Sequence, residues 1–200
     1  MPGLAEVLSG PVLEVAPRLL GAILTHTTDS GTVAVRLTEV EAYDGDQDPG
    51  SHAYRGPTRR NARMFGPAGH AYVYFTYGMH HCMNVVCGEP GRASAVLLRA
   101  GSVVKGVELA RVRRTGAPDR DLARGPARLC SALGIDLAHN GLDLSDGPLT
   151  LALSHPPPAE HLVGTGPRVG LRQAADHPWR YWLINEPSVS VFRPAKKLRH

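Results

Sequence analysis

Lysine, cysteine and long hydrophobic runs are all scarce in this sequence, and each shortage narrows the possible functions. Only three of the 200 residues are lysine, and none of these lies in the first hundred. The three cysteines are odd in number and form no Cys-x-x-Cys pair, which argues for reduced thiols in the cytoplasm rather than a disulfide scaffold. No apolar run approaches the roughly 18 residues that cross a membrane, and the N-terminal segment lacks the basic start of a secretory signal. We therefore expect a soluble cytoplasmic protein that has no membrane partner.

Arginine supplies most of the positive charge, since it accounts for all but three of the 22 basic residues. Five of the 18 acidic residues lie in the stretch 39–48, which contains no basic residue. The rest of the chain therefore sets 22 basic residues against 13 acidic ones, a net charge of +9. A basic body around one acidic stretch is typical of a polyanion-binding protein that keeps a carboxylate at its working centre. Genomic base composition explains the preference for arginine over lysine equally well.

The pattern of elements predicts one α+β domain over residues 1–200, built on a curved, mostly antiparallel sheet. Period-two alternation and β-branched or aromatic residues indicate the strands, and glycines close two of the helices. We expect strands at 32–43, 71–77, 81–86 and 94–100, helices at 107–114 and 126–133, and a long loop at 44–70. Residues 11–24 are expected to form a helix or a broken helical pair, with Pro17 at a kink or a new start.

The strand predicted at 32–43 carries two carboxylates where a polar residue is unusual. The apolar alternation of residues 33–37 is expected to continue on the same face with Glu39 and Glu41. Glu41 and Arg99, which lies on the strand at 94–100, then form either a general base with its guanidinium partner or a structural ion pair. The residues alone favour the ion pair.

Two conceivable metal sites are disfavoured by spacing. The stretch that begins at Asp44 starts like a calcium loop, but Pro49 and Arg55 occupy the positions that require Gly and Glu. His80 and His81 are adjacent on a strand and so point to opposite faces, which prevents them from sharing one zinc ion with the nearby cysteines. We expect neither a metal nor another cofactor.

Arginines and tyrosines lie close together in the middle of the chain. The segment 55–63 places Arg59 and Arg60 in a Gly/Pro-containing loop, where guanidinium groups grip phosphates well. A solvated loop is the alternative. The tyrosines of 71–77 could stack on nucleobases, although sheet core is the commoner fate of such residues.

Several strings, in order, resemble the alkyladenine (3-methyladenine or methylpurine) DNA glycosylase family, in the form of a compact bacterial member. The similarity covers essentially the whole chain. It rests on Thr38-Glu-Val-Glu-Ala-Tyr, His52, Thr58-Arg-Arg-Asn-Ala-Arg-Met-Phe-Gly, the long string from Gly69 to Val85, Val96-Leu-Leu-Arg-Ala, Gly125-Pro-Ala-Arg-Leu-Cys, Pro167-Arg-Val-Gly and Ser188-Val-Ser-Val.

The resemblance implies an open-barrel-like sheet flanked by helices, with a protruding hairpin that inserts into DNA. Glu41 matches the general base that activates the attacking water, and Arg99 matches the arginine that helps hold both. Tyr43, His52 and Tyr74 match the walls of the pocket for the extruded base.

Two further residues complete the site that the resemblance implies. Asn84 matches the asparagine that crowds the purine 2-position and disfavours guanine, and Tyr77 matches the tyrosine that wedges into the duplex. Arg59 and Arg60 are the phosphate-contact candidates among the DNA-binding residues.

The expected reaction is base excision from double-stranded DNA that contains damaged purines, by a monomer with no obligatory protein partner. The substrate class is 3-methyladenine, 7-methylguanine, hypoxanthine and ethenoadenine. Because no lysine precedes Lys105, Schiff-base chemistry at the site is disfavoured and a monofunctional hydrolase that leaves an abasic site is expected. The alternatives are a non-catalytic nucleic-acid-binding module, which has no use for Glu41, and a metal-dependent nuclease built on Glu39, Glu41, Asp44 and Asp46.

Overall fold

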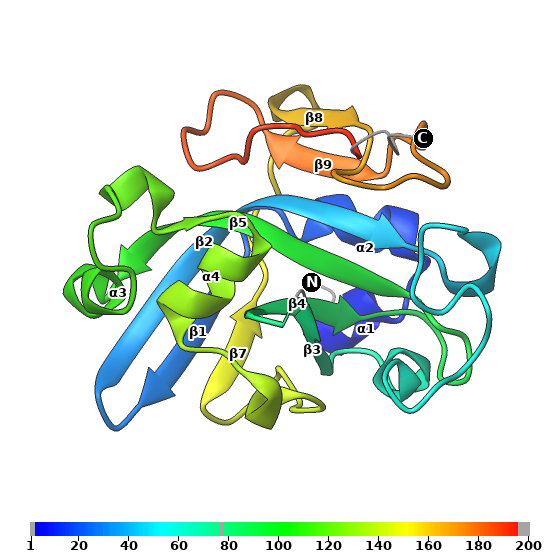
Figure 1. Ribbon diagram of the computed structural model, residues 1–200, viewed down its shortest axis with the longest axis horizontal. Helices are drawn as coiled ribbons and strands as arrows, with labels where there is room; N and C mark the ends of the chain where they lie inside the picture. Colours follow the sequence, from blue (N-terminus) through cyan, green and yellow to red (C-terminus); the bar gives the residue numbers. More distant parts are fainter. Residues whose placement is uncertain (1–2, 77, 196–200) are drawn as a thin grey trace.

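A computed structural model describes residues 3–76 and 78–195. Within these residues nine strands form one sheet in the order β3-β4-β5-β2-β1-β7, with β6 beside β5 and the β8–β9 hairpin beside β2 (Figure 1). Every pairing is antiparallel and the curved sheet is not closed, so the predicted α+β class is confirmed. The strands are β1 (Ile23–Thr28), β2 (Gly31–Tyr43), β3 (Ala71–Thr76), β4 (His80–Val86), β5 (Ala95–Lys105), β6 (Ala123–Arg124), β7 (Leu149–Ala152), β8 (Val163–Gly166) and β9 (Arg180–Leu183).

Helices are short and lie around this sheet. In Figure 1, α4 lies in front of the sheet near β2 and β5, while α1 and α2 lie toward the right of the view. Leu129, Cys130 and Leu133 of α4 share the main buried cluster with Met83 and Val85 of β4. The α-helices are α1 (Leu4–Leu8), α2 (Val12–Arg18), α3 (Val107–Arg113) and α4 (Pro126–Leu133), and the 3₁₀ turns are η1 (Gly45–Gln47), η2 (Ala62–Phe65), η3 (Asp119–Asp121), η4 (Leu137–His139) and η5 (Glu160–Leu162).

Most predicted elements are present, but the helix predicted at 11–24 is wrong in its second half. The helix α2 ends at Arg18, and β1 begins at Ile23. Gly21, at a φ of +78°, turns the chain between them in a left-handed conformation that a helix cannot contain. The three cysteines are buried and unbonded, as their number and spacing predicted. None of the helices in the described ranges is long and apolar enough to cross a membrane.

The pairing of β2 with β5 contains register shifts on both sides of Glu39, and they reverse the faces of β2. Alternate residues of 33–37 lie in the core, whereas beyond the shifts the core residues are Val40 and Ala42. Glu39 and Glu41 therefore leave the apolar face, and the expectation that they continue it is wrong. Bulges commonly redirect side chains in this way, and here the redirection brings both carboxylates to the same side as Arg99.

Candidate active site

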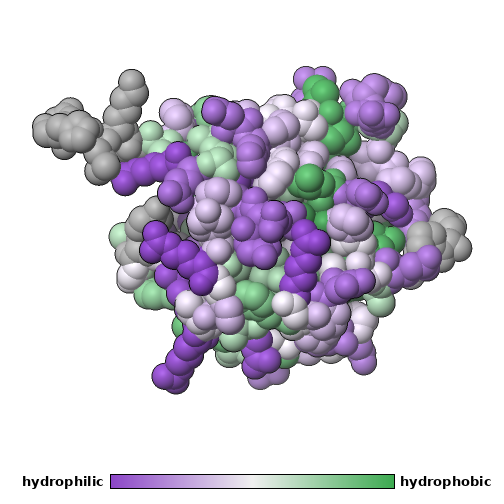
Figure 2. Space-filling model, turned by 90° about the vertical axis from the view of Figure 1, so that its right-hand side faces the viewer, coloured by the Kyte–Doolittle hydropathy of each residue, from purple (hydrophilic) through white to green (hydrophobic). Residues whose placement is uncertain are grey.

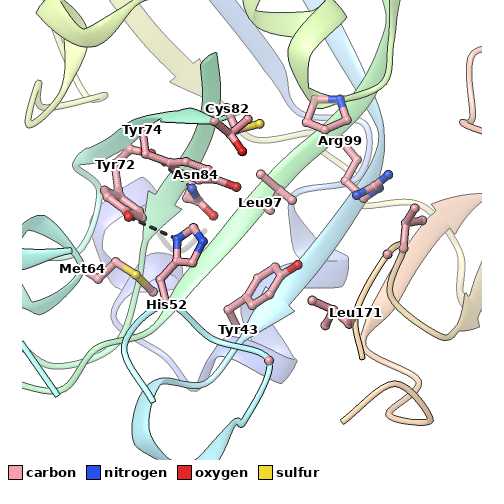
Figure 3. A pocket seen from close by; sticks show the side chains of 15 residues that line it. Tyr43, His52, Met64, Tyr72, Tyr74, Cys82, Asn84, Leu97, Arg99 and Leu171 are labelled. Atoms are coloured by element: carbon pink, nitrogen blue, oxygen red, sulfur yellow. Dashed lines mark hydrogen bonds between the residues drawn. The ribbon is translucent and has the colours of Figure 1, made fainter. Parts of the chain in front are cut away.

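A cavity of about 250 Å³ lies between the β3–β4 hairpin, the end of β2 and the segment 167–171 (Figure 3). This volume is at the small end for ligand pockets, so the cavity suits one small planar molecule. Its lining consists of Tyr43, Gly50, His52, Met64, Tyr72, Tyr74, Thr76, Cys82, Asn84, Leu97, Arg99, Pro126 and Val169–Leu171.

Aromatic side chains form the walls of the cavity. Tyr72 and Tyr74 project from the same face of β3 with ring centroids 5.4 Å apart, and the His52 ring stands edge-on to Tyr74 at 4.7 Å. The Tyr72 hydroxyl and His52 Nδ1 are 3.3 Å apart, and Figure 3 shows Tyr43 on the opposite side of the cavity. Burial raises the pKa of Tyr72 to about 12 and that of Tyr74 as well, while burial and then the charge of Arg60 lower the pKa of His52. These walls are thus uncharged at neutral pH and suit a planar cation.

Asn61 fixes the loop that carries His52. Its side-chain amide donates to the carbonyl oxygens of His52 at 2.9 Å and Gly56 at 3.0 Å, and its Oδ1 accepts from the Thr58 amide at 2.6 Å. Asn61 is buried, so these hydrogen bonds compensate its desolvation and also hold an otherwise irregular loop in one shape. Asn61 is therefore a positioning residue that the sequence motif contained but did not assign.

The Glu41 carboxylate lies directly behind the cavity wall and is fully buried. Its Oε2 accepts from the Tyr43 hydroxyl at 2.9 Å, and its Oε1 accepts from the Val169 amide at 2.7 Å. Nη1 of Arg99 is 3.2 Å from the same Oε1. All three partners line the cavity. Because a carboxylate has about four acceptor positions, Oε2 can accept one more hydrogen bond, which is what a bound water requires.

Glu39 holds Arg99 from the other side. Glu39 Oε1 accepts from Nε of both Arg99 and Arg180 at 2.7 Å, and its Oε2 accepts from the Ser190 amide at 2.6 Å. Burial acts to raise the pKa of Glu39, but the two guanidinium groups and these hydrogen bonds outweigh it and hold that pKa below its usual range. Arg99 thus bridges two carboxylates, of which Glu41 adjoins the cavity and Glu39 orients the guanidinium group.

A second buried ion pair positions the Val169 amide. Arg168 donates to Asp48 through both terminal nitrogens, Nη1 at 2.5 Å and Nη2 at 2.7 Å, and Nη1 also donates to the Ala42 carbonyl at 2.9 Å. The same guanidinium group lies 4.6 Å from the centre of the Tyr43 ring. The Asp48 side chain is fully buried, and through Arg168 it fixes the segment that contacts Glu41.

Asn84 belongs to the same cavity, whereas Arg59 and Arg60 are not among the described residues that line it. Asn84 is buried on β4, and its amide donates to the Tyr72 carbonyl at 3.2 Å. Arg60 lies outside, with its guanidinium 5.5 Å from the Tyr74 ring centre and donating to a backbone carbonyl at 3.2 Å, and Arg59 is exposed. Tyr77 lies outside the residues that the structure describes.

The surface around the loop 44–70 is mainly hydrophilic. In Figure 2, which views the right-hand side of Figure 1, hydrophilic side chains predominate and hydrophobic ones form small groups among them. This face has the polar character of a surface that contacts a hydrated ligand rather than an apolar one.

Residues 6–187 match the sequence model of the family described as "Methylpurine-DNA glycosylase (MPG)". The chain belongs to this family. Relatives named "Putative 3-methyladenine DNA glycosylase" agree with this assignment. The relative from Streptomyces avermitilis is 58% identical over 193 residues, which cover 94% of this chain and 90% of the relative. That from Leifsonia xyli subsp. xyli is 58% identical over 190 residues (90% and 88%), and that from Carboxydothermus hydrogenoformans is 46% identical over 179 residues (90% and 93%).

As a member of the methylpurine-DNA glycosylase family, the protein is an N-glycosyl hydrolase whose substrate is DNA. The resemblance found in the sequence is confirmed, and the non-catalytic binding module and the metal-dependent nuclease are set aside. To the residues expected from sequence, the structure adds Glu39, Asp48, Asn61, Arg168 and Val169 as groups that hold the site together.

Proposed function

We propose that this methylpurine-DNA glycosylase extrudes a damaged purine from duplex DNA into the aromatic cavity and hydrolyses its N-glycosidic bond with a water activated by Glu41. One observation carries the proposal: the buried Glu41 carboxylate is held behind a base-sized aromatic cavity by Tyr43, Arg99 and the Val169 amide. Both requirements of the reaction, a stacking site for a base and a proton acceptor beside it, are then met in one place.

Extrusion is required because the bond to the sugar cannot be reached inside the stacked duplex, and it costs a few kcal/mol of unstacking. Tyr77, which follows β3 in the sequence, is proposed to fill the gap that the nucleotide leaves, which offsets part of that cost. Tyr74 and Tyr43 then stack on the extruded base. Purines alkylated at N3 or N7 are cationic, and therefore bind more strongly to these electron-rich rings than ordinary purines do.

Hydrolysis follows in one displacement at the sugar C1′. Glu41 takes a proton from water as the water oxygen bonds to C1′, and the purine leaves with the electron pair of the C1′–N bond. A cationic alkylpurine departs as a neutral base, so the reaction needs little acid catalysis. Arg99 is proposed to orient the water relative to Glu41, because its hydrogen bond to Glu39 fixes the position of the Arg99 guanidinium group.

The substrates are proposed to be 3-methyladenine, 7-methylguanine, hypoxanthine and ethenoadenine. The test uses duplex oligonucleotides that each contain one of these lesions, with undamaged duplexes of the same sequence as controls, and measures free base by chromatography. The proposal expects release from at least one lesion duplex while the strand stays continuous until heated in alkali. Failure to release a base from any of the lesions would contradict it.

Asn84 is expected to restrict which purines are cut. Its amide projects into the cavity beside Leu97, where it would collide with the exocyclic amino group at the 2-position of guanine (Figure 3). The change Asn84→Ser removes this bulk, so the release of undamaged guanine and of 7-methylguanine should rise relative to that of 3-methyladenine. The expected rise is about tenfold or more, because adding or removing one small group in a pocket changes discrimination by about 1–3 kcal/mol. The measurement is the ratio of single-turnover rates. A ratio of rates equal to that of the wild type would show that Asn84 does not discriminate against purines with an amino group at the 2-position.

A further inference from the structure

A second cavity of about 400 Å³ adjoins the base cavity. Arg99 and Val169 line both cavities and therefore form the wall between them. The other side of the second cavity is made by Arg124, Arg128 and Arg193. We call this cavity, with its three outer arginines, the arginine groove.

The arginine groove contains positive charge that the described residues neutralise only in part. Arg128 and Arg193 are exposed, and neither forms an ion pair with a carboxylate among residues 3–76 and 78–195. Arg124 contacts one carboxylate, that of Asp121 at 3.2 Å. Burial, and to a smaller extent the charge of Arg128, lowers the pKa of the neighbouring Arg114. Such an arrangement is stabilised when an anion binds.

The backbone also gives the arginine groove a defined shape. Arg124 Nε donates to the Val189 carbonyl at 2.8 Å, and the Gly170 amide donates to the Arg193 carbonyl at 3.0 Å. These bonds join β6, the segment 167–171 and the C-terminal segment, so that Arg193 is held beside the base cavity. Arg128 is in the first turn of α4, which contains no acidic residue.

We propose that the arginine groove binds phosphodiester groups of the damaged strand next to the extruded nucleotide. The inference rests on the proposed function, because an extruded nucleotide remains joined to its strand and must place its phosphates at the mouth of the base cavity. Guanidinium groups bind phosphate oxygens through paired hydrogen bonds, and Arg128 and Arg193 are free to do so. By contrast, the Arg60 guanidinium, which the sequence favoured, contacts Tyr74 and a backbone carbonyl.

The test compares three single variants that each lose one positive charge: Arg128→Ala, Arg193→Ala and the control Arg18→Ala. Arg18 is exposed on α2 and lines neither cavity. Binding to a fluorescein-labelled duplex that contains a tetrahydrofuran abasic analogue is followed by anisotropy between about 50 and 200 mM KCl. Because this analogue has no base to release, the readout is independent of catalysis.

Affinity falls as salt rises, so the slope of log affinity against log salt is negative. The variants Arg128→Ala and Arg193→Ala should each make this slope less steep by about 0.9, the value for one lost phosphate contact, and Arg18→Ala should leave it unchanged. The variants Arg128→Lys and Arg193→Lys keep the charge and should restore most of the slope, which also separates lost contact from lost folding. Slopes for Arg128→Ala and Arg193→Ala equal to that of Arg18→Ala would overturn the proposal.

A second readout separates this inference from the proposed function. Single-turnover base release at saturating protein is measured for the wild type, for Glu41→Gln and for the control Arg18→Ala, which should match the wild type because Arg18 lines neither cavity. If the salt slopes of Arg128→Ala and Arg193→Ala equal that of the wild type while base release still requires Glu41, phosphate binding by the arginine groove is rejected and the proposed function stands. If release no longer requires Glu41, the proposed function fails whatever the slopes are.

Discussion

The change Glu41→Gln is expected to lower the single-turnover rate of base release by about 100-fold to 10,000-fold, the usual contribution of a general base. Glutamine has nearly the same shape, and its carbonyl can still accept from the Val169 amide and from Arg99. It cannot accept a proton from water at neutral pH. The cavity walls are unaffected, so affinity for the tetrahydrofuran duplex should stay within a few-fold of the wild type.

Glu39→Gln is the matched control for this prediction. Glu39 is the same residue type on the same strand and is equally buried, but it bonds to Arg99, Arg180 and Ser190, whereas Glu41 bonds to Tyr43 and Val169 of the cavity wall. We expect Glu39→Gln to lower the free energy of unfolding more than Glu41→Gln does, and to lower release less. Equal loss of release in the two variants would mean that Glu41 acts only by orienting Arg99.

The change Arg168→Met is expected to lower the free energy of unfolding by about 3–5 kcal/mol, because it leaves the fully buried Asp48 carboxylate without its partner. Urea unfolding followed by circular dichroism measures this loss. The double variant Arg168→Met/Asp48→Leu removes both charges and should recover most of the stability, since replacing a buried ion pair with apolar groups is often close to neutral.

Activity should not recover with stability in that double variant. Arg168 also sets the backbone that presents the Val169 amide to Glu41 and lies against the Tyr43 ring. We therefore expect base release to stay low in the double variant even when it is fully folded. A loss below about 1 kcal/mol in Arg168→Met, or full activity in the double variant, would contradict the positioning role.

Local sequence patterns predicted the strands and helices well where each element follows one period. Alternation over 32–43 gave β2, and the aromatic and β-branched run at 71–77 gave β3. The pattern failed at the register shifts around Glu39, because a bulge depends on the partner strand and has no consistent signal in its own residues. The strand pattern singled out Glu41 together with Arg99, and the family resemblance gave it the role of general base, but its face was predicted incorrectly.

The parts of the site that were missed depend on contacts between distant segments. Asp48 and Arg168 are 120 residues apart in sequence, and an acidic residue in a Gly- and Pro-containing loop is usually solvated. Nothing local distinguishes Asp48 from Asp46 two positions earlier. The string that contains Arg168 was part of the resemblance, which marked the segment but not the buried carboxylate that it contacts.

The central claim is that water, rather than an amine of the protein, displaces the purine. Borohydride trapping tests it directly: the wild type is incubated with a duplex that contains one lesion in the presence of sodium borohydride, and free base and protein–DNA adduct are measured together. The first lysine in the chain, Lys105, is exposed at the end of β5 and does not line the base cavity. We predict free base, a continuous abasic strand and no covalent adduct. An adduct that forms in proportion to the released base would contradict the account, because it would show that a protein amine had bonded to the sugar.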